Sequence, residues 1–168
     1  PYKVAEVFKT LEAFHPGRID LGIGRAPGGS EHSSLALAYP HYPTEAESFP
    51  HLLEALADFV DDQSAQGNKN FPGLETTPQG GRSPALWTLG SSDGSIELAA
   101  SNGLGFVPAL FIGTHDRPAD IMKRYRKMYR PRSETSPQNA PAIIASAVIC
   151  ADSKEEAELL AASHTYWK

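Results

Sequence analysis

Apolar residues recur at helical spacing near the start of the chain, and the positions that share this spacing are Val4, Val7, Phe8, Leu11 and Phe14. They predict an amphipathic helix over residues 3–14, which the turn at Pro16 and Gly17 ends. The pattern then changes to a short apolar run from Ile19 to Ile23, which predicts a strand over residues 18–24 with apolar residues on both faces. Such a run is typical of a parallel strand that is buried on both faces.

The next segments alternate between loops and regular elements. Residues 26–43 are rich in Gly, Pro, Ser and His and predict a long loop. Thr44 and Glu47 form a capping-box pattern ahead of a second apolar helix face. The members of that face are Phe49, Leu52, Leu53, Leu56, Phe59 and Val60. A second loop is expected over residues 67–84, before a short strand at 85–89.

The same alternation continues to the end of the chain. The pattern predicts a helix that ends at Gly103, a strand at 105–111, a basic helix at 117–129, a strand at 141–150 and a helix capped by Ser153 and Glu156. Repeated strand–helix units of this size predict an α/β fold with a parallel sheet, either open or closed into a barrel. We place a single domain at residues 1–168.

Composition narrows the class of protein. The chain is 40% hydrophobic and 21% charged, which is ordinary for a soluble globular domain. A formal net charge of -5 argues against general binding of nucleic acid. Seven of the 15 basic residues lie within residues 117–132, and we interpret that stretch as a solvated helix face and a loop.

The number of cysteines and the length of the apolar stretches indicate the cellular compartment of the protein. Cys150 is the single cysteine, which excludes an internal disulfide and fits a reducing cytoplasm. Because it lies in an apolar run, we expect it to be a buried small hydrophobe. No apolar stretch approaches the ~20 residues that span a membrane, and no signal peptide is visible. We therefore expect a cytoplasmic location.

The stretch "GSSDGS" over residues 90–95, here called the serine turn, is the first candidate site. A strand ends at Gly90 and a helix begins immediately afterwards, so backbone N–H groups and the hydroxyls of Ser91, Ser92 and Ser95 surround a helix N-terminus. The positive end of the helix dipole there favours a phosphate. The alternative is that Ser92 or Asp93 simply caps the helix, and this interpretation is the one we favour from the residues alone.

Arg25 is the second candidate. It follows "GIG" at the carboxyl end of a buried strand, which is the region where α/β proteins bind ligands. The alternative is a structural ion pair with an acid such as Glu31. The surrounding "GIGRAPGG" lacks the spacing of the glycine-rich nucleotide-binding fingerprints, and no helix follows it at once.

The remaining chemistry of the sequence is sparse. The six histidines show no metal-ligand spacing with one another, with cysteine or with carboxylates, so we expect no metal. His115 follows a predicted strand end and could face the same region as Arg25. No Ser/His/Asp pattern has a recognisable nucleophile elbow, and we assign no catalytic residue.

Three stretches resemble blocks of the bacterial luciferase-like flavin monooxygenases, in the order in which that family carries them. They are "VFKTLEAFHPGRIDLGIGRAPGG", "PALWTLGSSDGSIELAASNGLGF" and "YRPRSETSPQNAPAIIASAVICADSKEEAELL". Together they cover nearly the whole chain. The resemblance implies a TIM-type barrel that binds reduced FMN, supplied by a separate flavin reductase, and uses it with O2 to oxidise a small organic substrate.

The resemblance also implies a role for the two candidate sites. Arg25, Gly90, Ser91, Ser92 and Ser95 would surround the flavin phosphate. A guanidinium suits that role because it pairs with phosphate in a planar, charge-assisted fork. The small residues after Arg25 would let the backbone approach the cofactor closely.

The chain departs from the family in its extent. A complete barrel needs about 250 residues and eight strands, whereas the pattern here predicts about half of those strands. The family's first three strands, which include a catalytic histidine, have no counterpart. We therefore expect an incomplete, roughly half barrel: either a fragment of a longer enzyme or a short relative that pairs with a second copy. Because a half barrel exposes sheet edges and an apolar interior, we expect a homo-oligomer and not a monomer.

Three functions remain open at this point. The first is an FMN-dependent luciferase-like monooxygenase, or part of one. The second is a catalytically silent remnant that binds flavin or a partner. The third is a structural half barrel without a ligand, in which the serine turn is only a helix cap.

Overall fold

The computed structural model describes the whole chain except residues 26–28, 44, 62–69, 111–117, 134–135 and 167–168. Its centre is a three-stranded parallel sheet in the order β1-β2-β3. The strands are β1 (Asp20–Gly24), β2 (Ala85–Gly90) and β3 (Gly105–Pro108). Leu21 pairs with Leu86, and Trp87 pairs with Gly105, so all three strands end at the same edge of the sheet.

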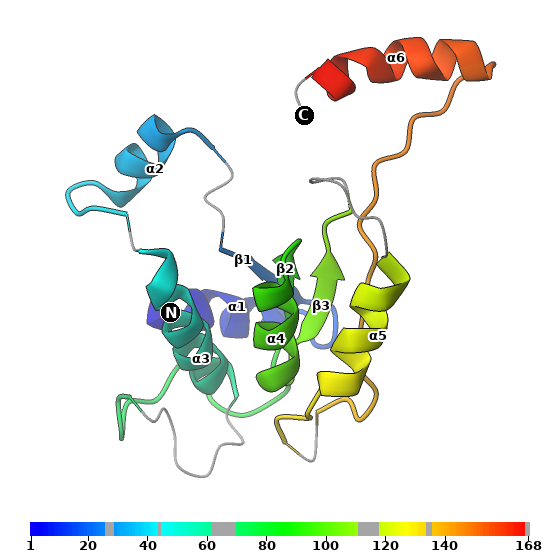
Figure 1. The fold of residues 1–168 in the computed structure, drawn as a ribbon. Helices are drawn as coiled ribbons and strands as arrows, with labels where there is room; N and C mark the ends of the chain where they lie inside the picture. Colours follow the sequence, from blue (N-terminus) through cyan, green and yellow to red (C-terminus); the bar gives the residue numbers. More distant parts are fainter. Residues whose placement is uncertain (26–28, 44, 62–69, 111–117, 134–135, 167–168) are drawn as a thin grey trace.

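The helices are α1 (Tyr2–Phe14), α2 (Glu31–Ala38), the short 3-10 helix η1 (Ala46–Ser48), α3 (Phe49–Val60), α4 (Asp93–Ser101), α5 (Pro118–Met128) and α6 (Lys154–Tyr166). Helices α1, α3, α4 and α5 pack around the sheet, whereas α2 and α6 stand away from it (Figure 1). No helix in the described part of the chain is both long enough and apolar enough to cross a membrane.

The packed helices cover one face of the sheet. Leu21 of β1 joins α1 and α3 in one core cluster, and Phe106 of β3 joins α4 and α5 in another. Because side chains alternate along a strand, Gly22, Trp87 and Leu89 point to the opposite face. Leu89 is 41% exposed there. Parallel sheets are ordinarily covered on both faces, so a sheet with helices on one side has the character of part of a barrel.

The structure thus confirms the predicted α/β class, with parallel strands that alternate with helices and a sheet that is open among the described residues. It also confirms the last predicted helix start, because the backbone N–H of Glu156 donates to Ser153 Oγ at 3.1 Å. The basic helix predicted over 117–129 is present as α5.

The strand predicted over residues 141–150 is wrong in extent. This segment pairs with β3 only at two isolated parallel bridges, through Ala142 and Ala145. Pro108 lies between the two bridged positions of the neighbouring strand and has no N–H to donate, so the ladder is interrupted there. It resumes where the backbone N–H of Leu110 donates to the carbonyl oxygen of Ala145 at 3.0 Å. Beyond the second bridge the segment lies in the open: Val148 is 84% exposed and Cys150 is exposed. The expectation of a buried Cys150 is therefore wrong as well.

Helix α1 forms where it was predicted, but it presents a different face to the core. Four of the five predicted apolar positions are exposed, and Phe14 reaches 75%. The buried positions are Ala5, Lys9 and Glu12. Small Ala5 packs in the cluster shared with α3, and a backbone loop receives the two charged side chains: Lys9 Nζ donates to the carbonyl oxygen of Thr76 at 3.2 Å.

The long loop expected over residues 26–43 contains a helix that the composition concealed. Ser30 caps α2 by accepting a hydrogen bond from the backbone N–H of Ser33 at 3.3 Å. The Leu- and Ala-containing run behind this cap has enough helix propensity to continue for two turns. Thr44, half of the predicted capping box, lies outside the described residues, and α3 begins after η1 with a proline in its first turn.

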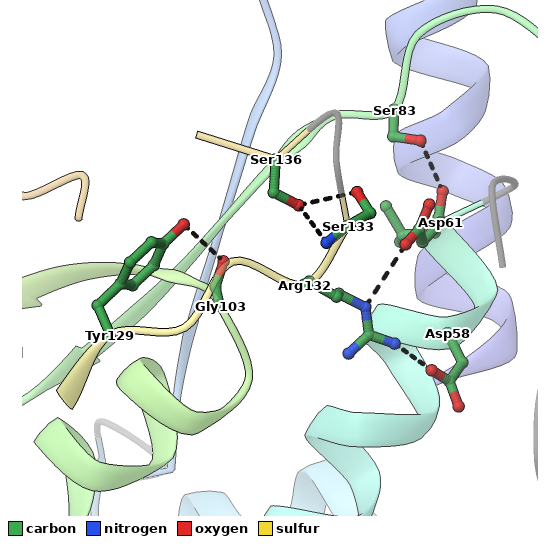
Figure 2. A network of polar contacts seen from close by, with 9 residues as sticks. Asp58, Asp61, Ser83, Gly103, Tyr129, Arg132, Ser133 and Ser136 are labelled. Carbon is green, nitrogen blue, oxygen red and sulfur yellow. Dashed lines mark hydrogen bonds and ion pairs between the residues drawn. The ribbon is translucent and has the colours of Figure 1, made fainter. Parts of the chain in front are cut away.

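A polar network lies at the amino-terminal end of the sheet, where the helices end, beside a cavity of about 600 Å³ that Asp61, Arg132 and Ser133 also line (Figure 2). Arg132 Nη2 is hydrogen-bonded to Asp58 Oδ1, and Arg132 Nε lies 3.6 Å from Asp61 Oδ2. The Asp58 side chain is only 3% exposed and that of Arg132 is 20% exposed. Nearby, Ser83 Oγ donates to the carbonyl oxygen of Val60 at 2.9 Å. The segment after α5 is in this way anchored to the end of α3.

Tyr125 of α5 and Tyr129, which follows that helix, attach the same segment to the start of β3. The Tyr125 hydroxyl lies 2.7 Å from the carbonyl oxygen of Leu104 and 2.9 Å from that of Pro141. The Tyr129 hydroxyl donates to the carbonyl oxygen of Pro137 at 2.8 Å. Burial raises the pKa of Tyr125 well above its ordinary value, and the neighbouring Tyr129 adds to the shift.

Candidate functional site

A pocket of about 350 Å³ lies at the carboxyl ends of β1 and β2, between the start of α3 and the start of α4. Its polar lining comes from Arg25, Thr88, Ser92, Ser95, Glu97 and Ser101. Its apolar lining includes Phe49, Pro50, Leu89 and Leu98. The carboxyl ends of parallel strands are where α/β folds place their ligands.

The pocket brings together three of the five predicted site residues. Arg25 follows β1, whereas Ser92 and Ser95 belong to the first turn of α4, and all three line the same cavity. Gly90 and Ser91 do not line it. They border a separate cavity of about 20 Å³ on the β3 side of α4, which Ser92 also lines.

The serine turn is a helix cap, as the more conservative interpretation predicted. Ser92 is the N-cap of α4. Its backbone N–H donates to Ser95 Oγ at 3.4 Å, and the two hydroxyl oxygens are 2.8 Å apart. In such a pair one hydroxyl donates its proton to the other, so the second proton and the remaining lone pairs stay available. The cap therefore positions two hydroxyls at the mouth of the pocket without using up their hydrogen-bonding capacity.

Gly90 supports the serine turn through the space it leaves. A Cβ at position 90 would overlap the Ser95 side chain, which lies directly against the end of β2. Glycine at this position is required by that close approach, and no unusual backbone angle is involved. Gly90 is thus a packing requirement for Ser95, even though it does not face the pocket.

Arg25 is exposed at the pocket. The alternative role considered for it, an ion pair with Glu31, is not formed in the structure. Within the described ranges of the chain, Arg25 has neither a hydrogen bond nor an ion pair. An arginine that lines a cavity without a protein partner is available to pair with an anion that enters the cavity.

Thr88 is a site residue that the sequence pattern missed. It is 1% exposed, and its Oγ1 has no hydrogen-bond partner among the described residues. A buried hydroxyl without a partner costs free energy, and this one lies at the wall of the pocket. The only signal in the sequence is a lone polar residue inside "ALWTLG", which is also what an ordinary strand can contain.

Charged side chains flank the first turns of α4. Arg124 of α5 places Nη1 2.7 Å from Asp93 Oδ1 and Nη2 3.7 Å from Glu97 Oε1. The solvated face predicted for the basic stretch agrees with Arg124, whose side chain is 46% exposed. The structure adds that its charge is directed at two acids beside the pocket.

The two remaining expectations from the sequence concern His115 and a metal site. His115 lies outside the described residues. No group of three or more His, Cys, Asp or Glu side chains gathers in a metal-binding arrangement in the part of the chain that the structure covers.

The match to known proteins extends over the whole chain. The family model that matches residues 1–168 is described as "Luciferase-like monooxygenase". The chain belongs to the luciferase-like monooxygenase family. The TIM-type barrel of that family explains the open sheet, whose helices cover one face only, as part of a barrel.

Individual relatives agree with this assignment. The chain is 39% identical to "Uncharacterized protein YceB" of Bacillus subtilis over 167 residues, which are 99% of this chain and 49% of that protein. It is also 39% identical to "N-acetyl-S-alkylcysteine monooxygenase" of the same bacterium, over 94% of this chain and 45% of that enzyme. The crystal structure of apo-MsnO8 superposes with a TM-score of 0.78 at 36% identity, over 99% of this chain and 47% of that one.

The chain spans about half the length of the curated relatives it matches. The activities and substrates of those longer proteins are therefore not assigned to this chain by similarity alone.

Proposed function

We propose that this chain is the phosphate-binding part of a luciferase-like monooxygenase that uses reduced FMN and O2 to oxidise a small organic substrate. The observation that carries the proposal is a single pocket shared by Arg25, which has no described partner, and the capped N-terminus of α4. Family membership supplies the chemistry to which this geometry is fitted.

The residues present fit a flavin phosphate. Arg25 offers a charged, forked donor, and Ser92 and Ser95 offer hydroxyls. The first N–H groups of α4 point out of the helix end, where a phosphate is favoured. Thr88 contributes a buried hydroxyl that still lacks a partner. The donor set therefore suits a di-anion better than a neutral ligand.

Reduced FMN, when bound, would supply the electrons that activate O2. The chain's own residues bind and orient. Arg25, Ser92 and Ser95 would hold the phosphate, whereas Phe49 and Leu98 form an apolar wall that would limit water around a ligand. We assign no residue of this chain to proton transfer or to contact with substrate.

The test is a titration of FMN, followed by quenching of its fluorescence, on the purified wild-type protein and on Arg25→Ala. We expect the variant to bind more weakly by about 1–3 kcal/mol, the value of one charge-assisted contact. Arg18→Ala is the matched control, because Arg18 is also exposed but precedes β1 at the opposite end of the strand. A folded wild-type protein that does not bind FMN would contradict the proposal.

A second candidate is a catalytically silent domain that binds flavin or a partner. The observation that favours it is the span of the chain, about half the length of its relatives. Turnover with reduced FMN and O2 separates the two functions. One relative is named for N-acetyl-S-alkylcysteine, so an N-acetyl-S-alkylcysteine is the first substrate to test. A third candidate, a half barrel without a ligand, requires that FMN does not bind at all.

We further propose that the protein forms a homo-oligomer in the cytoplasm and receives reduced flavin from a separate reductase. The open face of the sheet supports the association, because Leu89 and its neighbours on that face lack a covering layer among the described residues. Light scattering on the eluting protein should give a mass above 18.1 kDa for the assembly. A monomer at micromolar concentration would contradict this part of the proposal.

A further inference from the structure

Arg124 lies where it can control the charge of the pocket without touching a ligand in it. Asp93 is the first residue of α4, next to the N-cap Ser92. Glu97 follows one helical turn later and lines the pocket itself. Both acids lie on one side of the helix, as their i,i+4 spacing requires, and the guanidinium of Arg124 reaches both.

The two acids oppose phosphate binding. A carboxylate at the first position of a helix interacts favourably with the positive end of the dipole, so Asp93 competes with a phosphate for the same field. Glu97 adds a second negative charge at the wall of the cavity. Arg25 carries the opposite charge, and it is the only arginine or lysine among the described residues that line the pocket.

A count of the charges shows what Arg124 changes. With Arg124 present, two arginines balance two carboxylates around the first turns of α4. Without it, one net negative charge remains beside a site for a di-anion. We propose that Arg124 is a positioning residue of the phosphate site: it neutralises Asp93 and Glu97 and so leaves the α4 N-terminus and Arg25 available to the phosphate.

This inference rests on the proposed function, because it presupposes that FMN binds through its phosphate. It differs from a purely structural role for the ion pair. Exposed ion pairs contribute little to stability, and these side chains are 46%, 73% and 59% exposed for Arg124, Asp93 and Glu97. A charge near a bound di-anion changes the electrostatic free energy of binding, and the change is larger the closer the two charges lie.

The experiment compares FMN with riboflavin, which has the same ring system and no phosphate, on wild type and Arg124→Gln. We expect Arg124→Gln to weaken FMN binding about three- to tenfold and to leave riboflavin binding unchanged. Added salt should shrink the difference in FMN affinity between wild type and variant, because salt screens exposed charges. Arg126→Gln is the matched control, since Arg126 is also exposed on α5 and forms no ion pair with Asp93 or Glu97 in the structure.

Two further variants separate charge from shape. Arg124→Lys keeps the charge and should lose less FMN affinity than Arg124→Gln. Asp93→Asn in the Arg124→Gln background removes the unbalanced carboxylate and should restore FMN affinity to within about twofold of wild type. A structural role for Arg124 would show no such rescue.

The outcomes that overturn the inference are distinct from those that overturn the function. Equal losses of FMN and riboflavin affinity in Arg124→Gln, or no loss of FMN affinity, overturn the role of Arg124 alone. A wild-type protein that binds FMN no more tightly than riboflavin contradicts the phosphate site itself. In that case both proposals fall.

Discussion

Two arginines lie at opposite ends of the same sheet and are used in opposite ways. Arg132, at the amino-terminal end, is largely buried and paired with Asp58 and Asp61 (Figure 2). Arg25, at the carboxyl-terminal end, is exposed in a pocket and has no partner among the described residues. Arg132 neutralises the carboxylate of Asp58, which is buried in the fold. Arg25 is available to a charge that arrives from outside.

The difference follows the polarity of a parallel sheet. Strand N-termini are where the packed helices end, and there Arg132 pairs with acids of α3 and of the residue that follows it, beside a cavity of about 600 Å³. Strand C-termini are where the helices begin, and their free N–H groups and side chains face a cavity. Substitutions at the amino-terminal end should therefore change the free energy of unfolding, and those at the carboxyl-terminal end should change binding.

The largest effect on stability is expected for Arg132→Ala. It leaves Asp58 buried without its counter-charge, which costs about 3–5 kcal/mol. Urea unfolding measures the change, and FMN affinity per folded molecule should stay the same. Adding Asp58→Asn should recover part of the loss, because an amide is cheaper to bury than an unpaired carboxylate. A change below about 1 kcal/mol for Arg132→Ala would show that the amino-terminal network is dispensable.

Gly90→Ala tests whether the carboxyl-terminal end also has a packing requirement. The new Cβ overlaps the Ser95 side chain, so we expect a loss of about 1–3 kcal/mol in stability and weaker FMN binding. Gly94→Ala is the control for stability alone, since a Cβ there meets nothing within 4 Å beyond its chain neighbours and its own helix backbone, whereas Gly94 does line the pocket. Ser95→Gly in the Gly90→Ala background should relieve the overlap, and a double variant as unstable as Gly90→Ala would contradict this account.

Tyr125→Phe removes the hydroxyl that holds the segment after α5 at the amino-terminal end. We expect a loss of about 1 kcal/mol, the net value of one hydrogen bond. Burial also raises the pKa of Tyr125. The unfolded chain therefore gives up its phenol proton at a lower pH than the folded chain, and stability falls as the pH rises above about 10.

The pH dependence gives Tyr125 its own measurement. Urea unfolding at about pH 8 and about pH 11 should show a smaller alkaline loss in Tyr125→Phe than in wild type. Tyr42→Phe, at a side chain that is 89% exposed, should behave as wild type. Identical alkaline losses in Tyr125→Phe and wild type would rule out the buried phenol as the cause.

The smallest effect on stability is expected for Arg25→Ala. An exposed side chain without a protein partner contributes within about 0.5 kcal/mol. The same variant should still lose FMN affinity, so binding and stability separate at this end of the sheet. A stability loss comparable with that of Arg132→Ala would end the contrast between the two arginines.

Pattern in the sequence determined the elements and most of their limits. Helical spacing predicted α1 and α3, cap signals predicted α4 and α6, and a basic stretch predicted α5. Short apolar runs predicted four strands, and the first three form β1, β2 and β3 in that order, because these signals are local. The cap at Ser92 was predicted for the same reason. Composition concealed α2, since Gly, Pro and His nearby outweighed the local cap at Ser30.

Tertiary structure decided which faces are buried and which residues share a site. The apolar stripe of α1 predicted an inward face, but contacts with a distant loop buried Lys9 and Glu12 instead. The run at 141–150 had strand character, but it pairs only at Ala142 and Ala145, because Pro108 interrupts the ladder between the two bridges.

The pocket follows the same logic. Arg25 and Ser92 were each visible in the sequence, whereas their convergence, the unpartnered hydroxyl of Thr88 and the reach of Arg124 to Asp93 come from packing between elements far apart in the chain. Spacing along the chain encodes local hydrogen bonds and amphipathic faces, but only the folded arrangement brings separate charges close enough to act together.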